Sequence, residues 1–252
     1  MTSSPLFALR DGLRGAVVIA AKDVRIYYAK PQVIMWGVAF PAFLFLSWSV
    51  GRRVPVSSQI PALLAVALFF TASSIGPVVI PWEKRARTFE RLLTAPIPLW
   101  SVLTGKTLAG MFFGLAVATL VVVVGLATGT PVTSFATLVL GIMLSSGAFA
   151  SLGVLFSTIP TQDVAAVMMP ATLVRWPLLF VSGLFVPLND LPAWGRAFAY
   201  ASPLTYTNDL CQGAMGGTSR FSVTLSLAVL LAYWALFLVL GLGLHELGRR
   251  RA

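Results

Sequence analysis

Apolar residues fill six stretches of the chain, each close to the roughly 20 residues that a helix needs to cross a bilayer. Every charged residue except Arg175 lies outside these stretches. This pattern predicts an all-α, polytopic membrane protein in which residues 1–252 form a single transmembrane domain. The predicted spans are residues 33–50, 60–81, 107–128, 134–159, 164–187 and 222–245.

The first 32 residues predict a helix of another kind. Leu13, Val17, Ala20 and Val24 recur at helical spacing, and basic residues lie around the opposite side. We therefore expect residues 1–32 to form an amphipathic arm that lies in the membrane interface and leads into the first span.

The segment between the second and third spans, residues 82–106, concentrates charge. Six charged residues lie between Glu83 and Arg91, and the sequence from Glu83 to Ala95 favours a helix with Glu83 and Arg87 on one face. Its apolar strip would consist of Phe89, Leu92 and Leu93. The sequence thus predicts a short amphipathic helix parallel to the membrane. The simpler interpretation is a solvated loop whose charges only orient the chain.

Residues 188–221 form a second long segment, before the last span. Trp194 and Phe198 lie at helical spacing after Pro192, which predicts a short helix with one apolar face and with Tyr206 near its rim. Two roles are open for Trp194, Phe198 and Tyr206. They would either seal the outer end between subunits or gate the exit of a substrate.

Composition supports a membrane protein and excludes several kinds of site. Hydrophobic residues make up 58% of the chain and charged residues only 10%, with a mean hydropathy of +0.88. One cysteine excludes an internal disulfide, and a single histidine excludes clustered His and Cys metal ligands. A metal site made of carboxylates is not excluded by these counts, but the acids are scattered along the chain, so we expect no metal site.

The net charge of +10 is better explained by topology than by nucleic acid. Lys and Arg gather in the N-terminal arm, in residues 82–106 and at the C-terminus, and are sparse in the other connections. With six spans, this predicts a multi-pass protein of the cytoplasmic membrane with both termini, and residues 82–106, in the cytoplasm.

Arg175 is the only charged residue near the middle of a span. Burying it costs roughly 3 kcal/mol or more, so it should face protein, water or an anion rather than lipid. Asp163 is about 18 Å away along a continuous helix, too far for a direct pair. If Pro170 and Pro177 break this helix, Arg175 can donate to freed backbone carbonyls. The alternative is contact with an anionic substrate or lipid head group.

Two motifs carry a resemblance to a known family. The pattern E-x-x-x-x-T-x-E-R-L-L-x-x-P, followed by G-K at the start of the next span, is matched by Glu83, Thr88, Glu90, Arg91, Leu92, Leu93, Pro96, Gly105 and Lys106. Together with residues 177–206, it resembles ABC-2 type permeases, the membrane subunits of one class of ATP-driven exporter.

The resemblance implies several features of the molecule. The helix at residues 83–95 would couple the permease to a separate ATPase subunit through Glu83, Arg87, Phe89, Glu90, Arg91 and Leu92. The outer segment would dip back into the membrane. A second copy, or a similar chain, would complete the translocation pathway within the lipid.

Nucleotide binding by this chain itself is not expected. The fragment Gly105–Thr107 reads G-K-T, but Trp100 stands where a phosphate loop requires glycine. The chain is therefore expected to be no enzyme and to bind no cofactor, with ATP and Mg²⁺ held by the partner. A secondary transporter is the weaker alternative, because no acid or histidine lies at mid-membrane. A non-transporting assembly or regulatory subunit of the same fold stays open.

Overall fold

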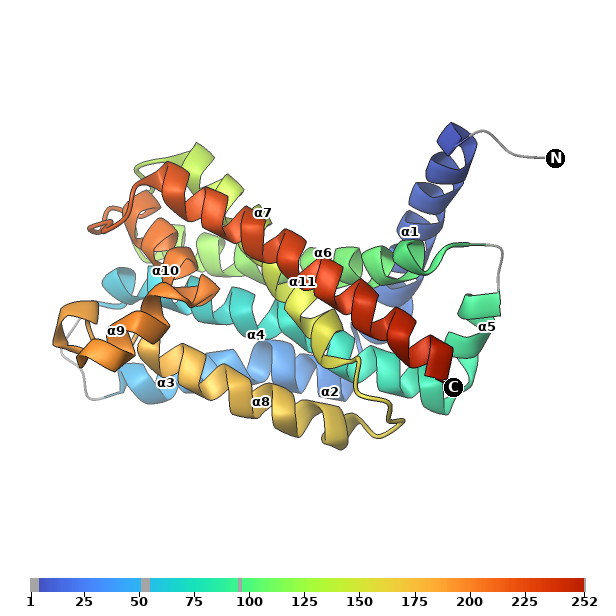
Figure 1. The fold of residues 1–252 in the computed structure, drawn as a ribbon. Helices are drawn as coiled ribbons and strands as arrows, with labels where there is room; N and C mark the ends of the chain where they lie inside the picture. The colour runs from blue at the N-terminus through green and yellow to red at the C-terminus, as the bar shows by residue number, and fades with distance from the viewer. Residues whose placement is uncertain (1–4, 51–54, 95–96, 252) are drawn as a thin grey trace.

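The structure is a computed structural model that describes residues 5–50, 55–94 and 97–251. Within these residues it consists of helices, turns and loops without strands, as the apolar pattern predicts (Figure 1). The helices are α1 (Pro5–Tyr27), α2 (Pro31–Ile34), the π-helix η1 (Met35–Ala39), α3 (Phe40–Ser49), α4 (Val56–Arg85), α5 (Thr88–Thr94), α6 (Leu99–Ala127), α7 (Phe135–Phe156), α8 (Val164–Val181), the 3₁₀ helix η2 (Leu188–Asp190), α9 (Ala193–Tyr200), α10 (Pro203–Ala214) and α11 (Val223–Arg251).

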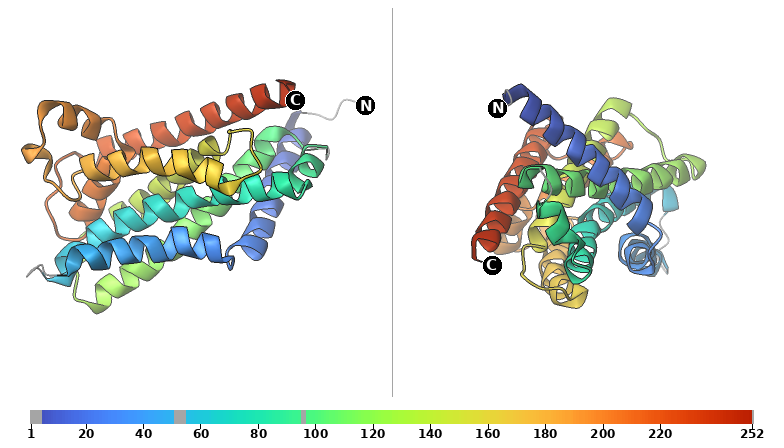
Figure 2. Two further views of the ribbon diagram at one scale, coloured as in Figure 1. Left: turned by 90° about the horizontal axis from the view of Figure 1, so that it is seen from below. Right: turned by 90° about the vertical axis from the view of Figure 1, so that its right-hand side faces the viewer.

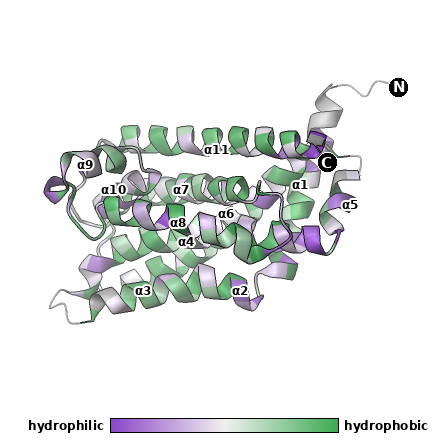
Figure 3. Cartoon of the chain, turned by 60° about the horizontal axis from the view of Figure 1, so that its bottom comes forward, coloured by the Kyte–Doolittle hydropathy of each residue, from purple (hydrophilic) through white to green (hydrophobic). Residues whose placement is uncertain are grey.

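Among the described helices, α4, α6, α7, α8 and α11 are long and apolar enough to cross a membrane. The run formed by α2, η1 and α3 meets α1 at a bend of 95°. If this bent pair is counted as one span, the number of spans rises from five to six. Each predicted span coincides with one of these runs. Figure 3 shows that hydrophobic residues cover their length, whereas hydrophilic residues gather at the two ends.

Two boundaries differ from the predicted ones. The helices α4 and α6 extend beyond their apolar stretches, to Arg85 and back to Leu99, so they absorb much of the predicted loop at residues 82–106. The helix α8 ends at Val181, six residues before the predicted end. Its end is followed by Gly183, whose φ of +79° suits glycine and does not continue a right-handed helix.

The helix α4 forms the centre of the bundle. Over its most apolar stretch it is 94% buried inside the protein, against 11% for α11 on the outside. It packs along α6 and α7, and also contacts α8 and α10. The aromatic rings of Phe69, Phe70 and Phe149 meet in this core at centroid distances of 5.0 and 5.3 Å.

The two ends of the bundle differ. Both termini and α5 lie at one end, which we call the α5 end, and α9 and α10 lie at the other, the α10 end (Figure 1). The helix α1 runs across the α5 end, roughly perpendicular to the long helices (Figure 2). The position of α1 in a membrane interface stays a prediction.

A proline inside a helical run leaves the carbonyl four residues earlier without its helical N–H donor, and three of these carbonyls have a side-chain donor instead. In each case a side chain from another element donates to that carbonyl: Thr71 to Gly37 before Pro41, Thr130 to Ser57 before Pro61, and Arg175 to Ser73 before Pro77. At these three prolines, other segments of the bundle therefore supply the donor that the helix lacks.

Candidate functional site

The predicted helix from Glu83 to Ala95 is interrupted. Glu83 belongs to the last turn of α4, and the next helix, α5, begins only at Thr88. Between them Arg87 adopts a φ of +54°, which no right-handed helix accommodates. The prediction that Glu83 and Arg87 share one helical face is therefore wrong, because the chain turns between them.

The helix α5 has an inner apolar side and an outer charged side. Phe89 is 6% exposed and packs with Ile80 of α4 and Val102 of α6, and Leu92 lies half-buried beside them. The charged side chains of Arg87, Glu90 and Arg91 are exposed. The side chain of Leu93 and all of Pro96 lie outside the described residues. Phe89 and Leu92 thus hold a helix whose charged residues face away from the bundle.

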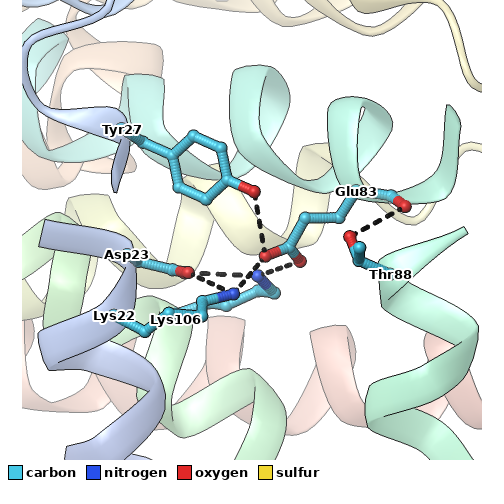
Figure 4. A network of polar contacts seen from close by, with 6 residues as sticks. All are labelled: Lys22, Asp23, Tyr27, Glu83, Thr88 and Lys106. Atoms are coloured by element: carbon cyan, nitrogen blue, oxygen red, sulfur yellow. Dashed lines mark hydrogen bonds and ion pairs between the residues drawn. The ribbon is translucent and has the colours of Figure 1, made fainter. Parts of the chain in front are cut away.

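Behind α5 lies a cluster of four charged side chains that we call the charge cluster: Lys22 and Asp23 of α1, Glu83 of α4 and Lys106 of α6 (Figure 4). Lys106 contacts Glu83 and lies 3.2 Å from Asp23. Lys22 lies 2.5 Å from Glu83 and 2.8 Å from Asp23. The side chains of Asp23, Glu83 and Lys106 are completely buried, and that of Lys22 is 32% exposed.

Two ammonium groups and two carboxylates make the charge cluster neutral. Burying a charge is tolerated only when it is paired and hydrogen-bonded, which holds for each group here. The hydroxyl of Tyr27 also donates to Glu83 at 3.4 Å. Partial burial of Lys22 would lower its pKa, but the neighbouring carboxylates of Asp23 and Glu83 raise it by more, so the net shift is upward.

Close packing of α1 on α6 brings the charges together. A Cβ atom on Gly105 would lie 2.7 Å from the carbonyl oxygen of Ala16, so only glycine fits there. One turn away, the Ser101 hydroxyl donates to the Gly12 carbonyl at 2.5 Å. The adjacent Gly105 and Lys106 thus have distinct roles, the first in close approach and the second in ion pairing. The result is a fixed junction of α1, α4 and α6.

The sequence reasoning missed the partners of Glu83. It placed Glu83 on the docking surface, whereas the structure turns its carboxylate inward to Lys22 and Lys106. One signal was available, since Glu83 and Lys106 have opposite charges at the adjoining ends of two consecutive antiparallel helices. Lys22 and Asp23 gave no such signal, because their place depends on how α1 crosses the bundle.

A cavity of about 440 Å³ lies beside α5. It is bounded by Phe89 and Glu90 of α5, by the turn after α7 and by His245 and Arg249 of α11. On its inner side Lys84 donates to the carbonyls of Ser157 and Ile159, at 3.3 and 3.2 Å, which satisfies groups at the end of α7. The surface around α5 is therefore hollowed as well as charged.

Arg175 is completely buried between helices. Its guanidinium donates to the Ser73 carbonyl at 2.5 Å, the carbonyl that Pro77 leaves free, and lies 6.0 and 5.5 Å from the ring centroids of Phe70 and Phe156. The sequence predicts a carbonyl freed by proline as the acceptor, but one in the helix of Arg175 itself, whereas the acceptor belongs to α4. The helix α8 continues through Pro170 and Pro177 rather than breaking.

The three residues proposed for the outer end do not meet in one place. Trp194 and Phe198 of α9 are 66% and 63% exposed, so the apolar face of α9 points away from the bundle. Tyr206 instead belongs to α10, where it is buried against Phe221 and donates to the Tyr200 carbonyl at 2.9 Å. Within the residues that the structure describes, three or more His, Cys, Asp or Glu side chains nowhere come together as a metal site.

Comparison with known proteins identifies the family. The profile of ABC-2 type transporters matches residues 16–215, which include α5 and the charge cluster. The chain belongs to the ABC-2 type transporter family. The inner membrane transport permease YadH of Escherichia coli (strain K12) is 23% identical over 191 residues, which cover 75% of this chain and 74% of that protein. The protein of the same name from Shigella flexneri matches to the same extent.

Membership of the ABC-2 family makes this chain the membrane subunit of a transporter. The several membrane-crossing helices agree with a multi-pass protein. For this family the general kind of partner is an ABC ATPase. The α5 end is the part of this family member to analyse first, because the described residues of the sequence motif between Glu83 and Lys106 lie there.

Proposed function

We propose that the chain is the permease subunit of an ATP-driven exporter of the inner membrane, and that it works as a dimer with a second copy or a similar chain. Two ATPase subunits would sit at the α5 end and would bind ATP and Mg²⁺. The observation that carries this proposal is α5 itself, a helix with exposed Glu90 and Arg91 on one side and buried Phe89 on the other, and with the exposed Arg87 in the turn before it.

A motor that closes on ATP needs a rigid element to push. Arg87, Glu90 and Arg91 would dock on the ATPase by charge complementarity, and Phe89 and Leu92 would transmit the movement into the bundle. Glu83 is given a positioning role in place of direct docking, since the charge cluster ties α4 to α1 and α6. The three helices would then move together from an inward-open to an outward-open arrangement.

The same proposal assigns the two ends to the two sides of the membrane. The α5 end, with both termini, would face the cytoplasm, and α1 would lie in the cytoplasmic interface. The α10 end would face outward, with α9 and α10 as a segment that dips back into the membrane. The burial of α10 against α4, α7 and α11 supports this placement.

Affinity purification from native membranes in a mild detergent tests the proposal. The tagged protein is compared with Glu90→Ala/Arg91→Ala, which removes one acid and one base from α5. Asp190→Ala/Arg196→Ala is the matched control, because it removes the same charges from exposed positions at the α10 end. We expect a phosphate-loop ATPase with the parent and the control, and little of it with the α5 variant.

The outcomes separate the parts of the proposal. Equal recovery of the ATPase with all three proteins would refute docking through Glu90 and Arg91 but leave the permease role intact. If no ATPase accompanies a monodisperse parent protein, the exporter loses its energy source, and a carrier or a non-transporting subunit becomes the better explanation.

A further inference from the structure

A second cavity lies at the α10 end, far from α5. It has a volume of about 710 Å³, within the range of small-molecule sites. Three segments enclose it: the turn from Ser182 to Asn189, one face of α10, and residues 218–220. The proposed coupling to an ATPase involves the α5 end and does not explain why this cavity has a polar lining.

The lining from α10 is a polar stripe along one face of this helix. Thr205, Asn208, Asp209 and Gln212 follow the spacing i, i+3, i+4, i+7 and so lie along one helical face. Leu204, Cys211 and Ala214, from the remaining faces, pack into the hydrophobic core. A membrane protein that only needed to fill space here would gain more from apolar residues at those four positions.

The walls of the cavity are held in place by hydrogen bonds. Asp209 accepts three, from the Ser219 hydroxyl at 2.7 Å and from the backbone N–H groups of Arg220 and Phe221 at 2.6 and 3.1 Å. The Arg220 guanidinium donates to Asn189 at 2.8 Å and thereby joins the two loops. The cavity is thus preorganised, and Asp209 and Arg220 balance each other in charge.

Two buried residues of the lining each have a side-chain oxygen without a hydrogen-bond partner. Thr205 is 1% exposed and Asn208 is 9% exposed, and neither the Thr205 hydroxyl oxygen nor the Asn208 side-chain oxygen has a partner. An unsatisfied buried oxygen costs roughly 1–3 kcal/mol. An occupant that donates hydrogen bonds would remove this cost.

The chemistry of the lining selects the kind of ligand. An anion offers only acceptors and would meet the carboxylate of Asp209 and the oxygen of Asn208. A hydroxyl-rich ligand both donates and accepts, which suits Thr205, Asn208 and Gln212 together. We propose that the cavity at the α10 end binds an uncharged, hydroxyl-rich group of the size of one or two sugar rings, from a free saccharide or from the head group of a glycolipid.

The test uses the full chain in phosphatidylcholine nanodiscs, without alkyl-glycoside detergent. Maltose is the free-saccharide probe, followed by saturation-transfer NMR. A galactosyl diacylglycerol in the nanodisc is the lipid probe, followed by the shift in melting temperature. Inorganic phosphate serves as the anionic comparison. Binding of maltose identifies a free saccharide as the source, and stabilisation by the glycolipid alone identifies a membrane lipid.

Thr205→Val/Asn208→Leu removes both unpartnered oxygens at nearly constant volume. Because those oxygens have no hydrogen-bond partner within the protein, we expect an unchanged or higher melting temperature without ligand, and binding weakened at least about tenfold. Gln212→Leu, on the half-buried edge of the cavity, should weaken binding as well. Thr119→Val, whose hydroxyl only contacts its own helix, is the control and should bind like the parent.

Three results would overturn the proposal. The first is a parent protein that responds to neither sugar probe. The second is a double variant, or Gln212→Leu, that binds as tightly as the parent. The third is phosphate binding in preference to both sugars. Because none of these measurements involves an ATPase, failure here is distinguishable from failure of the coupling proposal.

Discussion

Glu83 and Arg175 are both buried charges, but the protein accommodates them in different ways. Glu83 is neutralised by two lysines from other helices. Arg175 forms no ion pair with any described residue, and instead uses a backbone carbonyl and two aromatic rings. The two arrangements predict different effects of substitution on stability. The effect of replacing Glu83 should depend on its lysine partners, and the effect of replacing Arg175 should depend on Pro77, which frees the carbonyl that Arg175 contacts.

Glu83→Gln should lower the melting temperature strongly, because removing one partner of a buried ion pair costs roughly 3–5 kcal/mol. It leaves the charge cluster with a net charge of +1. Adding Lys106→Met restores neutrality, and we expect it to recover at least half of the loss in thermal unfolding experiments. Glu90→Gln, on the exposed side of α5, should change little. A double variant no more stable than Glu83→Gln would contradict this account.

Arg175→Met should be less harmful when Pro77 is absent. Pro77→Ala supplies an N–H to the Ser73 carbonyl, so the hydrogen bond from Arg175 is no longer needed there. We expect Arg175→Met to cost roughly 1–3 kcal/mol in the parent and less than half of that with Pro77→Ala. Unfolding measurements on the parent, the two single variants and the double variant test this expectation.

The control for this cycle is Pro61→Ala, which lies about 24 Å from Pro77 along α4 at the helical rise. Its effect should add to that of Arg175→Met within about 0.5 kcal/mol. If the effects of Arg175→Met and Pro77→Ala on the free energy of unfolding also add, Arg175 does not stabilise the carbonyl freed by Pro77.

At the scale of elements, α5 is a short helix that depends on its neighbours. A helix of 7 residues is too short to be stable alone in water. Phe89 attaches it to α4, α6 and α7, and the turn at Arg87 lets it leave the axis of α4. The orientation of α5 is therefore set by its contacts more than by its own sequence.

Phe89→Ala should release α5 while the bundle stays folded. Loss of a buried phenylalanine costs roughly 3 kcal/mol or more, so hydrogen exchange of the α5 amides should rise by about 100-fold. Exchange in α7 should not change, and Arg91→Ala should leave α5 protected because its side chain is exposed. Unaltered protection of α5 in Phe89→Ala would refute the role of Phe89 as the anchor.

At the scale of the whole molecule, the two ends have different chemistry. The α5 end combines neutralised buried charges with an exposed charged helix, and the α10 end combines a polar cavity with an exposed apolar helix face. Between them α4 runs almost entirely inside the protein. This difference between the two ends is consistent with the two proposals, an ATPase at the α5 end and a ligand at the α10 end.

Cysteine labelling tests which end faces the cytoplasm. Cys211 is the only cysteine, so Cys211→Ala gives a background for single reporters at Arg91→Cys and Thr218→Cys, both at exposed positions. A membrane-impermeant maleimide should label Thr218→Cys in intact cells and Arg91→Cys only after permeabilisation. The reverse pattern would invert the proposed orientation.

Much of the fold was predictable because the bilayer imposes a length on apolar helices. Each of the six apolar stretches became a helical run, and the exposure of Glu90 and Arg91 beside a buried Phe89 followed from their spacing. Helix ends were less predictable. The split between α4 and α5 rests on the backbone of Arg87, a residue type that gives no warning of a left-handed conformation.

The sequence by itself determined the all-α membrane class, the position of the spans and the charged segment at α5, because these depend on local periodicity and on apolar length. Only the tertiary structure decided that Glu83 faces inward, since its partners Lys22 and Lys106 lie 61 and 23 residues away. It also decided which proline supplies the acceptor for Arg175. Such contacts depend on how helices cross, and the angle of 95° between α1 and the first span is set by packing rather than by any local pattern.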